Sequence, residues 1–163
     1  MIHRILATCS LLACTQPPPV ADKPDSGVPV LSGQVALRYA IDTDLLAKMD
    51  EPARGVFYGE IFDARQVSAG TPQSGALPLD YVEHSLDMGD GTIPTELLHT
   101  TPPLTVDEIV IIGFLDSDEN AGEHGNAADG GDPIAPGADY SFEVVIDITT
   151  TATVVFTRLE PTR

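Results

Sequence analysis

The chain has 163 residues, of which 25 are acidic and 8 are basic, and its formal net charge is -17. This length suits a single domain, and a hydrophobic share of 42% is sufficient for a core, so the composition is that of a folded chain. The acidic excess argues against nucleic acid and anionic membrane surfaces as electrostatic partners, and it is compatible with the binding of cations.

The charge is unevenly distributed along the chain. No Lys or Arg occurs between Arg65 and Arg158, a stretch of 92 residues that contains 16 acidic side chains. Surface ion pairs therefore cannot neutralise most of these acids. Solvent, counterions or a bound cation must reduce the repulsion between them.

The N-terminus has the features of an export signal. A short basic start, Met1–Arg4, precedes an apolar run over residues 5–13. This run is too short to cross a bilayer core, which takes about 20 residues, but its length is typical of a secretory signal peptide. A buried N-terminal strand is the alternative. It is disfavoured because Cys9 and Cys14 are the only cysteines in the chain, although an exported domain is free to use disulfides.

The segment Leu11-Leu12-Ala13-Cys14 resembles a bacterial lipobox, in which the cysteine is lipidated and becomes the new N-terminus. The resemblance implies a signal peptide over residues 1–13 and an attachment to the lipid bilayer through acylated Cys14. By analogy with lipoprotein sorting, Thr15 after the cysteine favours the outer membrane.

A Pro-rich segment follows the predicted anchor. Three consecutive prolines, Pro17-Pro18-Pro19, favour an extended backbone, and the surrounding residues lack an apolar period. Residues 14–30 are therefore predicted to be a tether, and residues 31–163 are predicted to be one β-sandwich domain.

The domain itself has the pattern of β-strands. Apolar residues alternate with polar ones or form short runs between Gly, Pro and Asp. One helical turn is predicted after Asp42, which would cap it. The Asp90-Gly91 pair predicts a hairpin, and Pro94 would confine the return strand to a sheet edge. The predicted strands are 35–41, 55–62, 79–86, 92–98, 106–115, 140–148 and 152–159.

These seven strands predict an all-β fold, namely an antiparallel two-sheet sandwich of the Ig-like or transthyretin-like kind. A small barrel is the alternative. The continuous apolar run Val110-Ile111-Ile112 suits a central strand that is covered on both faces. Thr149-Thr150-Thr151 is predicted to be a turn or a bend between the last two strands.

A long acidic loop is predicted between the strand that ends at Leu115 and the one that begins near Tyr140. A connection of this length without structure of its own is unusual in a compact domain and is generally functional or disordered. Asp116, Asp118 and Asn120 stand at relative positions one, three and five of this loop, so their side-chain oxygens can converge on one cation. Ca²⁺ takes six to eight such oxygen ligands. The predicted metal ligands are Asp116, Asp118, Asn120, the backbone carbonyl of Gly122, Asp129 and Asp132.

The loop departs from an EF-hand. Counted from Asp116, position six is Ala121 where an EF-hand has Gly, and position twelve is Ala127 where it has the bidentate Glu. Neither flank has a helical pattern. The predicted site is therefore a calcium loop between strands. An acidic loop without metal, held by Asx-turns or mobile in water, is the alternative.

The loop resembles the DxDxN…DxGDP calcium loops of secreted bacterial domains, and the chain over residues 31–159 resembles prealbumin-like or carboxypeptidase-regulatory-like modules of uncharacterised bacterial envelope lipoproteins. The resemblance rests on residues 56–62, 112–120 and 129–133. It implies a fold and no particular activity. A transthyretin-like hydrolase would be expected to end in a Tyr-Arg-Gly-Ser type motif, which Glu160-Pro161-Thr162-Arg163 does not match.

No catalytic constellation is apparent. His84, His99 and His124 lack zinc-ligand spacing, and the chain has no GxSxG elbow, P-loop or Rossmann fingerprint. We therefore predict no catalytic residues, no bound organic cofactor and no enzyme activity.

The predicted function is that of a membrane-anchored, calcium-binding lipoprotein that acts as a binding or structural module of the cell envelope. Its ligand would be an unidentified protein or glycan, and the module would be a monomer. An envelope hydrolase that uses loop carboxylates and a subunit of a surface assembly are the alternatives.

Overall fold

The computed structural model describes residues 30–49, 53–89, 99–124, 127–135 and 140–161. The predicted signal peptide, Cys14 and nearly all of the predicted tether lie outside these residues. The strands are β1 (Gln34–Ile41), β2 (Arg54–Asp63), β3 (Val67–Ser68), β4 (Thr71–Pro72), β5 (Asp80–Asp87), β6 (His99–Thr100), β7 (Glu108–Asp116), β8 (Pro133–Ala135), β9 (Ser141–Glu143), β10 (Thr149–Phe156) and β11 (Arg158–Leu159). The helical turns are α1 (Thr43–Leu46), η1 (Ala64–Gln66) and η2 (Ala121–His124).

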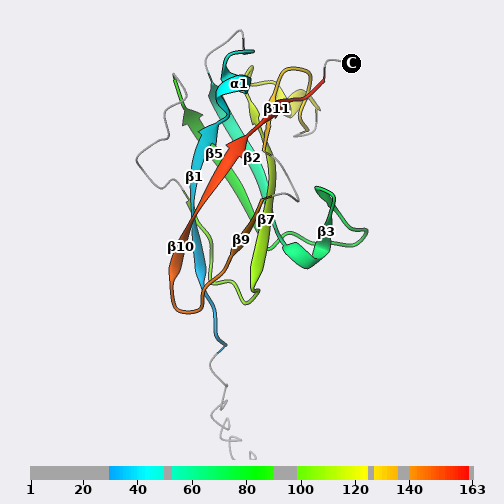
Figure 1. Cartoon of the computed structure of the whole chain (residues 1–163). Coiled ribbons are helices and arrows are strands. Elements are labelled where there is room, and N and C mark those ends of the chain that lie inside the picture. Colours follow the sequence, from blue (N-terminus) through cyan, green and yellow to red (C-terminus); the bar gives the residue numbers. More distant parts are fainter. Residues whose placement is uncertain (1–29, 50–52, 90–98, 125–126, 136–139, 162–163) are drawn as a thin grey trace, which may run out of the picture.

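The strands form two facing sheets, which confirms the predicted all-β sandwich. One sheet has the order β10-β1-β6, and the other has the order β11-β8-β7-β2-β5, with β9 paired to one end of β7. In Figure 1, β1 and β10 lie in front of β2 and β5. A separate small hairpin, β3 with β4, projects to one side in the segment between the predicted strands 55–62 and 79–86.

The core between the sheets is built around Phe57 of β2. Its ring centroid lies 5.0 Å from that of Tyr39 in β1 and 5.7 Å from that of Phe156 in β10, so one ring joins the two sheets. All three side chains are completely buried. Aromatic pairs in these tilted and edge-on geometries add to the free energy gained from burying the ring area.

Two glycines make room for the Phe57 ring. Gly59 and Gly113 face each other across β2 and β7. A Cβ on Gly59 would lie 2.6 Å from the Phe57 ring, and a Cβ on Gly113 would lie 2.4 Å from the backbone oxygen of Tyr58. A side chain at either position would displace the ring, which explains why these strands carry glycine at a central register position.

The helical turn was predicted correctly. Asp42 caps α1 by accepting hydrogen bonds from the backbone N–H groups of Asp44 and Leu45. Such a cap satisfies donors that the first turn of a helix leaves free. Among the described residues, no helix has the length and apolarity that a bilayer crossing requires.

The pairing of the first and last long strands differs from the prediction. β1 and β10 are parallel, with Gln34 beside Thr149 and Ile41 beside Phe156, whereas a fully antiparallel sandwich was expected. Between β1 and β10 the chain crosses from one sheet to the other several times, since it forms β2 and β5 of the six-stranded sheet, β6 beside β1, and then β7, β8 and β9 of the six-stranded sheet. A connection of this length can return in either direction, so strand alternation alone does not determine the orientation.

The predicted strand 140–148 is mostly wrong. Only Ser141–Glu143 is a strand, and Asp147 adopts a left-handed φ of 60° in the turn that follows. Ile146 and Ile148 are consequently half exposed. The chain has to turn here because β9 belongs to one sheet and β10 to the other. Residues 149–151, predicted as a turn or a bend, are the start of β10.

The predicted return strand 92–98 lies outside the described residues. The strand that follows it, β6, pairs antiparallel with β1 and so belongs to the sheet opposite β5.

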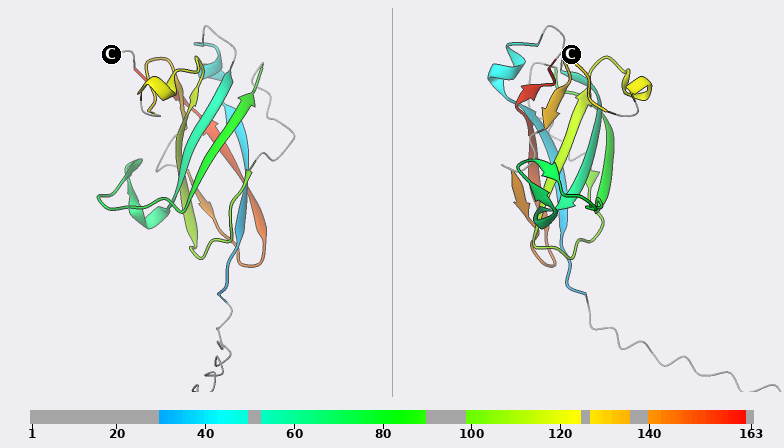
Figure 2. Two further views of the ribbon diagram at one scale, coloured as in Figure 1. Left: turned by 180° about the vertical axis from the view of Figure 1, so that it is seen from behind. Right: turned by 90° about the vertical axis from the view of Figure 1, so that its right-hand side faces the viewer.

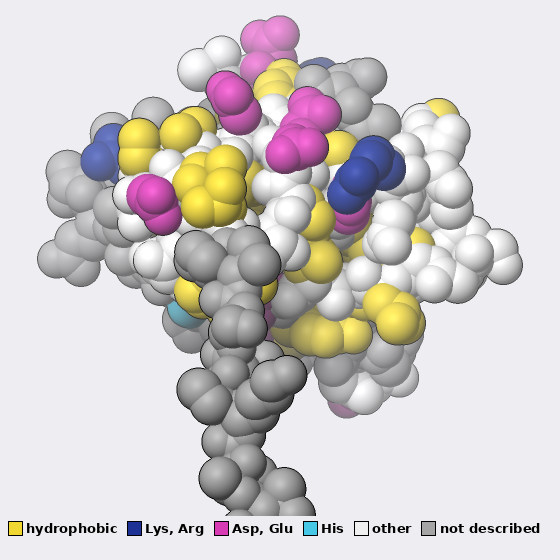
Figure 3. Space-filling model, turned by 90° about the horizontal axis from the view of Figure 1, so that it is seen from below, with side chains coloured by type: hydrophobic (Ala, Val, Ile, Leu, Met, Phe, Trp, Pro, Cys, Tyr) yellow, Lys and Arg dark blue, Asp and Glu magenta, His cyan; other side chains and the backbone are white. Residues whose placement is uncertain are grey.

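The end of the domain at which the described chain begins is partly apolar. Figure 3 views the molecule from this end, where hydrophobic side chains lie among acidic ones. The large exposed hydrophobic residues include Val30, Leu31, Ile146 and Ile148. The turn before β10 is tied to the start of β1, because the Asp147 N–H donates to the Ser32 carbonyl at 2.9 Å. The acidic loop lies at the opposite end (Figure 1).

Candidate metal centre

The acidic loop is shorter than predicted and is held at both ends. It leaves β7 at Asp116 and enters β8 directly after Asp132, so the expected structureless connection to Tyr140 is interrupted by η2 and β8. β8 pairs antiparallel with β7, with Phe114 opposite Ile134. This pairing fixes the two ends of the loop side by side, and short strands of this kind lack the length that sequence patterns need for detection.

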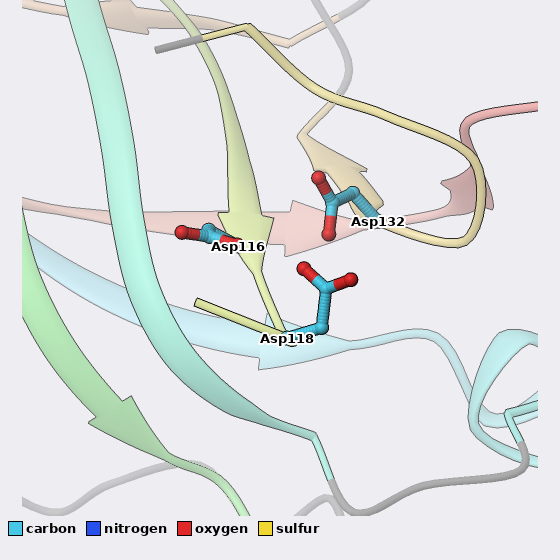
Figure 4. Close-up of side chains that lie close together, drawn as sticks. All are labelled: Asp116, Asp118 and Asp132. Atoms are coloured by element: carbon cyan, nitrogen blue, oxygen red, sulfur yellow. The ribbon is translucent and has the colours of Figure 1, made fainter. Parts of the chain in front are cut away.

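Three carboxylates of the loop converge. Ligand oxygens of Asp116, Asp118 and Asp132 all lie within 4.8 Å of one another. Figure 4 shows the carboxylates of Asp118 and Asp132 facing each other, with Asp116 beside them at the end of β7. Asp116 and Asp132 are each only 2% exposed, whereas Asp118 is at the surface. Two of the three acids are thus buried close to a third, and this group can hold a metal ion.

Backbone N–H groups orient the two buried carboxylates. Asp116 accepts hydrogen bonds from the N–H groups of Asn120 and Ala121, both at 3.1 Å. Asp132 accepts from the N–H groups of Ser117 at 3.2 Å and Asp129 at 3.1 Å. Each carboxylate oxygen has two lone pairs, so a cation can be bound while these hydrogen bonds persist.

Asn120 and Asp129 join the group through hydrogen bonds. The Asn120 amide Nδ2 donates to Asp118 Oδ2 at 2.7 Å and to Asp129 Oδ2 at 2.9 Å. An N–H₂ group therefore lies between two carboxylates, in a position that favours positive charge. The amide oxygen Oδ1 is buried and has no hydrogen-bond partner. A buried polar atom of this kind is costly, and it marks a place where an additional ligand would be favourable.

The remaining predicted ligand, Gly122, lies exposed in η2. A Cβ at this position would meet no atom within 4 Å, so the site does not require glycine for steric reasons. The backbone carbonyl of Gly122 stays a predicted ligand.

The group is electrostatically strained in the absence of a cation. Partial desolvation within the loop raises the pKa of Asp118, and the negative charge of Asp129, a hydrogen bond with Asp116 and the negative charge of Asp116 raise it further. Burial also raises the pKa of Asp132, against the opposing effect of its backbone hydrogen bonds. A raised carboxyl pKa means that the folded chain resists the full negative charge, which either a proton or a cation would relieve.

The described residues supply little compensating charge. Their ion pairs are Arg65 with Asp63 and His99 with Asp80, and both lie outside the loop. Lys48 lines a depression of about 260 Å³ together with Asp118, Asp129 and Asp132. Its exposed side chain adds a positive charge at the rim of the site.

The loop also packs on the sheet through small side chains that the sequence analysis did not single out. Ala121 is buried against Phe114 and Ile134, with Tyr58 and Ala128 at the edge of the same cluster. The backbone of Glu160 completes the anchoring, because its N–H donates to the Asp132 carbonyl at 2.8 Å and its carbonyl accepts from Gly131 at 3.0 Å. The alanines at positions 121, 127 and 128, in a loop that is otherwise made of polar residues and glycine, are the sequence signal for this packing.

Two of the histidines, which lack zinc-ligand spacing in the sequence, lie close together in the fold. The ring centroids of His84 and His99 lie 5.3 Å apart, and His99 Nε2 lies 2.8 Å from Asp80 Oδ2. The aspartate group of the loop is nevertheless the one cluster of three or more His, Cys, Asp or Glu in the described parts of the chain with ligand atoms this close.

Fold and site together define the class as an all-β sandwich that carries an acidic, potentially metal-binding loop. No protein-family model matches the sequence, and neither a curated protein nor a solved structure shows a significant match.

Proposed function

We propose that the chain is an envelope lipoprotein whose β-sandwich binds Ca²⁺ in the acidic loop and acts as a non-catalytic binding or structural module. The observation that carries the proposal is the convergence of Asp116, Asp118 and Asp132 beside the buried, unpartnered oxygen of Asn120. Four carboxylates, with Asp129, and one amide would supply most of the oxygen ligands that Ca²⁺ needs, and water would supply the rest.

The chemistry of the donors favours Ca²⁺ over other metals. The three side chains that converge offer hard oxygen ligands, which suit Ca²⁺ better than zinc or copper. The carboxylates come from a loop with turns at Glu119 and Gly131, both of which have positive φ. A flexible oxygen cage of this kind suits Ca²⁺ better than Mg²⁺, which requires a tight octahedron and retains its waters.

Asn120 would change its role when the ion binds. A rotation of its amide by about half a turn would direct Oδ1 toward the space between Asp118 and Asp129, where Nδ2 lies now. The amide would then be a metal ligand, and the buried oxygen would gain a partner.

The start of the described chain and the acidic loop lie at opposite ends of the sandwich, an arrangement that suits a tethered module. The described chain begins at Val30, at the end of the sandwich opposite the acidic loop (Figure 1). If Cys14 carries the membrane anchor, the loop end would point away from the bilayer. The affinity expected for such an extracellular module is weak, with a dissociation constant on the order of 10⁻⁴ to 10⁻³ M.

Calorimetric titration of the chelated domain with Ca²⁺ tests the proposal. We expect one site per chain, and at a free Ca²⁺ concentration ten times the dissociation constant the fold should gain about 1.4 kcal/mol. The variant Asp118→Asn removes an exposed ligand without disturbing the core, so it should fold and lose binding. Glu119→Gln makes the same charge change at the next residue, outside the carboxylate group, and should bind nearly as wild type. Equal binding by both variants would refute a site at this position.

The anchor is tested separately with Cys14→Ser in the expression host. The full-length chain should be found in the membrane fraction and be labelled by a fatty-acid probe, and the variant should lose both properties. A variant that fractionates as wild type would contradict the lipoprotein part of the proposal and leave the calcium site unaffected.

A further inference from the structure

The outer face of the six-stranded sheet contains a second feature, away from the acidic loop carboxylates. β2, β5 and β7 together form a depression of about 400 Å³. The left panel of Figure 2 views this face, with β2 and β5 in front and no described element lying over them. Its side-chain lining consists mainly of Tyr58, Tyr81, Phe114, Ile112, Glu60 and Glu83.

The strand register interleaves aromatic and acidic side chains on this face. Tyr58 stands opposite Glu83 on one side and Phe114 on the other. Glu60, two residues further along β2, stands opposite Tyr81 and Ile112. Side chains directly opposite each other in antiparallel strands are about 5 Å apart at Cβ, so each of the two glutamates stands beside a tyrosine on this face.

The middle of this face is open while its ends are closed. Phe62 and Val110, which face outward at one end, are almost fully buried, and so is Phe114 at the other. Between them, Tyr81 is 66% exposed. The Tyr58 and Phe114 ring centroids lie 5.6 Å apart and form one wall of the depression.

The two carboxylates of the depression have no counterion. Glu60 is only partly exposed, yet neither it nor Glu83 has a hydrogen bond or an ion pair with another described residue. No Lys, Arg or His lines the depression. Negative charge that has no counterion and stands beside aromatic side chains favours a ligand that carries positive charge and an apolar surface.

We propose that this depression binds an organic cation, of the size of an alkylammonium or guanidinium group, between the Tyr58 and Tyr81 rings and the Glu60 and Glu83 carboxylates. Ring faces attract such cations through their quadrupole, and the carboxylates supply the opposite charge. The proposal names the ligand class of the binding module proposed above and rests on that role, but it does not require calcium. The acidic loop influences the site because Ala121 and Ala128 pack in the same cluster as Phe114 and Tyr58.

The probe is choline, and its control is 3,3-dimethyl-1-butanol, which has the same shape without the charge. Both are titrated into the isotope-labelled full domain and followed by NMR at constant ionic strength, because a chain this acidic attracts any cation weakly. We expect choline, and not the alcohol, to shift the amide signals of residues 58–60, 81–83 and 112–114.

Variants locate the interaction. Glu60→Gln and Tyr81→Ala should each weaken choline binding by about fivefold, since each removes one favourable contact with the cation. Both positions are accessible, so the variants should fold, and thermal melting checks this. Tyr140→Ala removes an exposed tyrosine elsewhere and should bind as wild type.

Three outcomes would overturn the proposal: equal binding of the alcohol, shifts that map to the acidic loop only, or unchanged affinity in Glu60→Gln. Repeating the titration with chelator and with Ca²⁺ separates the two proposals. If the domain binds choline but not Ca²⁺, the calcium proposal alone is contradicted. If it binds Ca²⁺ but not choline, this proposal alone is contradicted.

Discussion

Two clusters of side chains that contain acids differ in how their negative charge is compensated. Between the sheets, Asp80 of β5 lies 2.8 Å from His99 of β6, so an imidazole from the opposite sheet faces the carboxylate. In the acidic loop, Asp116, Asp118 and Asp132 converge, and no Lys, Arg or His of the described residues forms an ion pair with them. In the first cluster, the chain itself supplies the partner of the carboxylate. The second concentrates negative charge that a proton or an external cation would neutralise.

This difference relates to how few basic residues the chain has. Each buried carboxylate must be paired, protonated or bound to a metal, since an unpaired buried charge is costly. The chain contains 8 Lys and Arg for 25 acids. A cluster placed on a loop, where an ion can enter from solvent, is a physically reasonable way to satisfy buried acids without using a basic side chain.

The largest expected effect comes from removing a buried carboxylate of the loop. Asp116→Ala leaves the N–H groups of Asn120 and Ala121 without their acceptor and deletes a metal ligand. We expect a loss of about 3 kcal/mol in the free energy of unfolding with Ca²⁺ present, measured by denaturant titration. The control Glu143→Ala, an exposed acid on β9, should change it little. Equal losses in both variants would mean that the loop carboxylates are no different from surface acids.

The histidine cluster should make folding sensitive to mild acid. Burial lowers the pKa of His84, and the neighbouring His99 lowers it further. The unfolded chain therefore binds a proton at this histidine more readily than the folded chain does. The contribution of neutral His84 to the free energy of unfolding is fully present above about pH 6.5, and it is lost as the pH falls from there through the lowered pKa of the folded state. His84→Gln should flatten this part of the stability profile. An unchanged slope in the variant would show that another group is responsible.

The smallest expected effect concerns the rim of the loop site. Lys48 contributes positive charge to the depression that contains Asp118 and Asp132. Lys48→Gln should strengthen Ca²⁺ binding by about twofold at low salt and by less at physiological salt, because the charge is exposed and screened. Arg38→Gln, on the exposed side of β1, is the matched control. Weaker Ca²⁺ binding in Lys48→Gln would contradict the view that the positive charge of Lys48 opposes the ion.

Much of the fold follows from local patterns. The alternation in β1, the aromatic run in β2 and the apolar run in β7 predicted their strands, and Asp42 predicted the cap of α1. These features depend on residues that are neighbours in sequence. The parallel pairing of β1 with β10 joins opposite ends of the domain, and the early end of β9 depends on which sheet the next strand enters. Neither is encoded in a short window.

The candidate site could likewise be predicted only in part from the sequence. The DxDxN pattern and the Asp-Gly-Gly-Asp segment identified Asp116, Asp118 and Asp132, which the structure brings together. The hydrogen bonds of Asn120, the alanine packing beneath the loop and the Glu160 anchor depend on contacts between segments that are distant in sequence. Composition and spacing can indicate the elements of such a site, and only the tertiary fold specifies how they converge.

The most direct test of the calcium site is a crystal structure of the domain grown in millimolar Ca²⁺ and measured at a wavelength that gives the ion an anomalous signal. The account predicts one peak about 2.3–2.6 Å from oxygens of Asp116, Asp118 and Asp132, with the Asn120 amide rotated so that Oδ1 faces the ion. A loop without a peak, in which Asn120 Nδ2 still bridges Asp118 and Asp129, would contradict it.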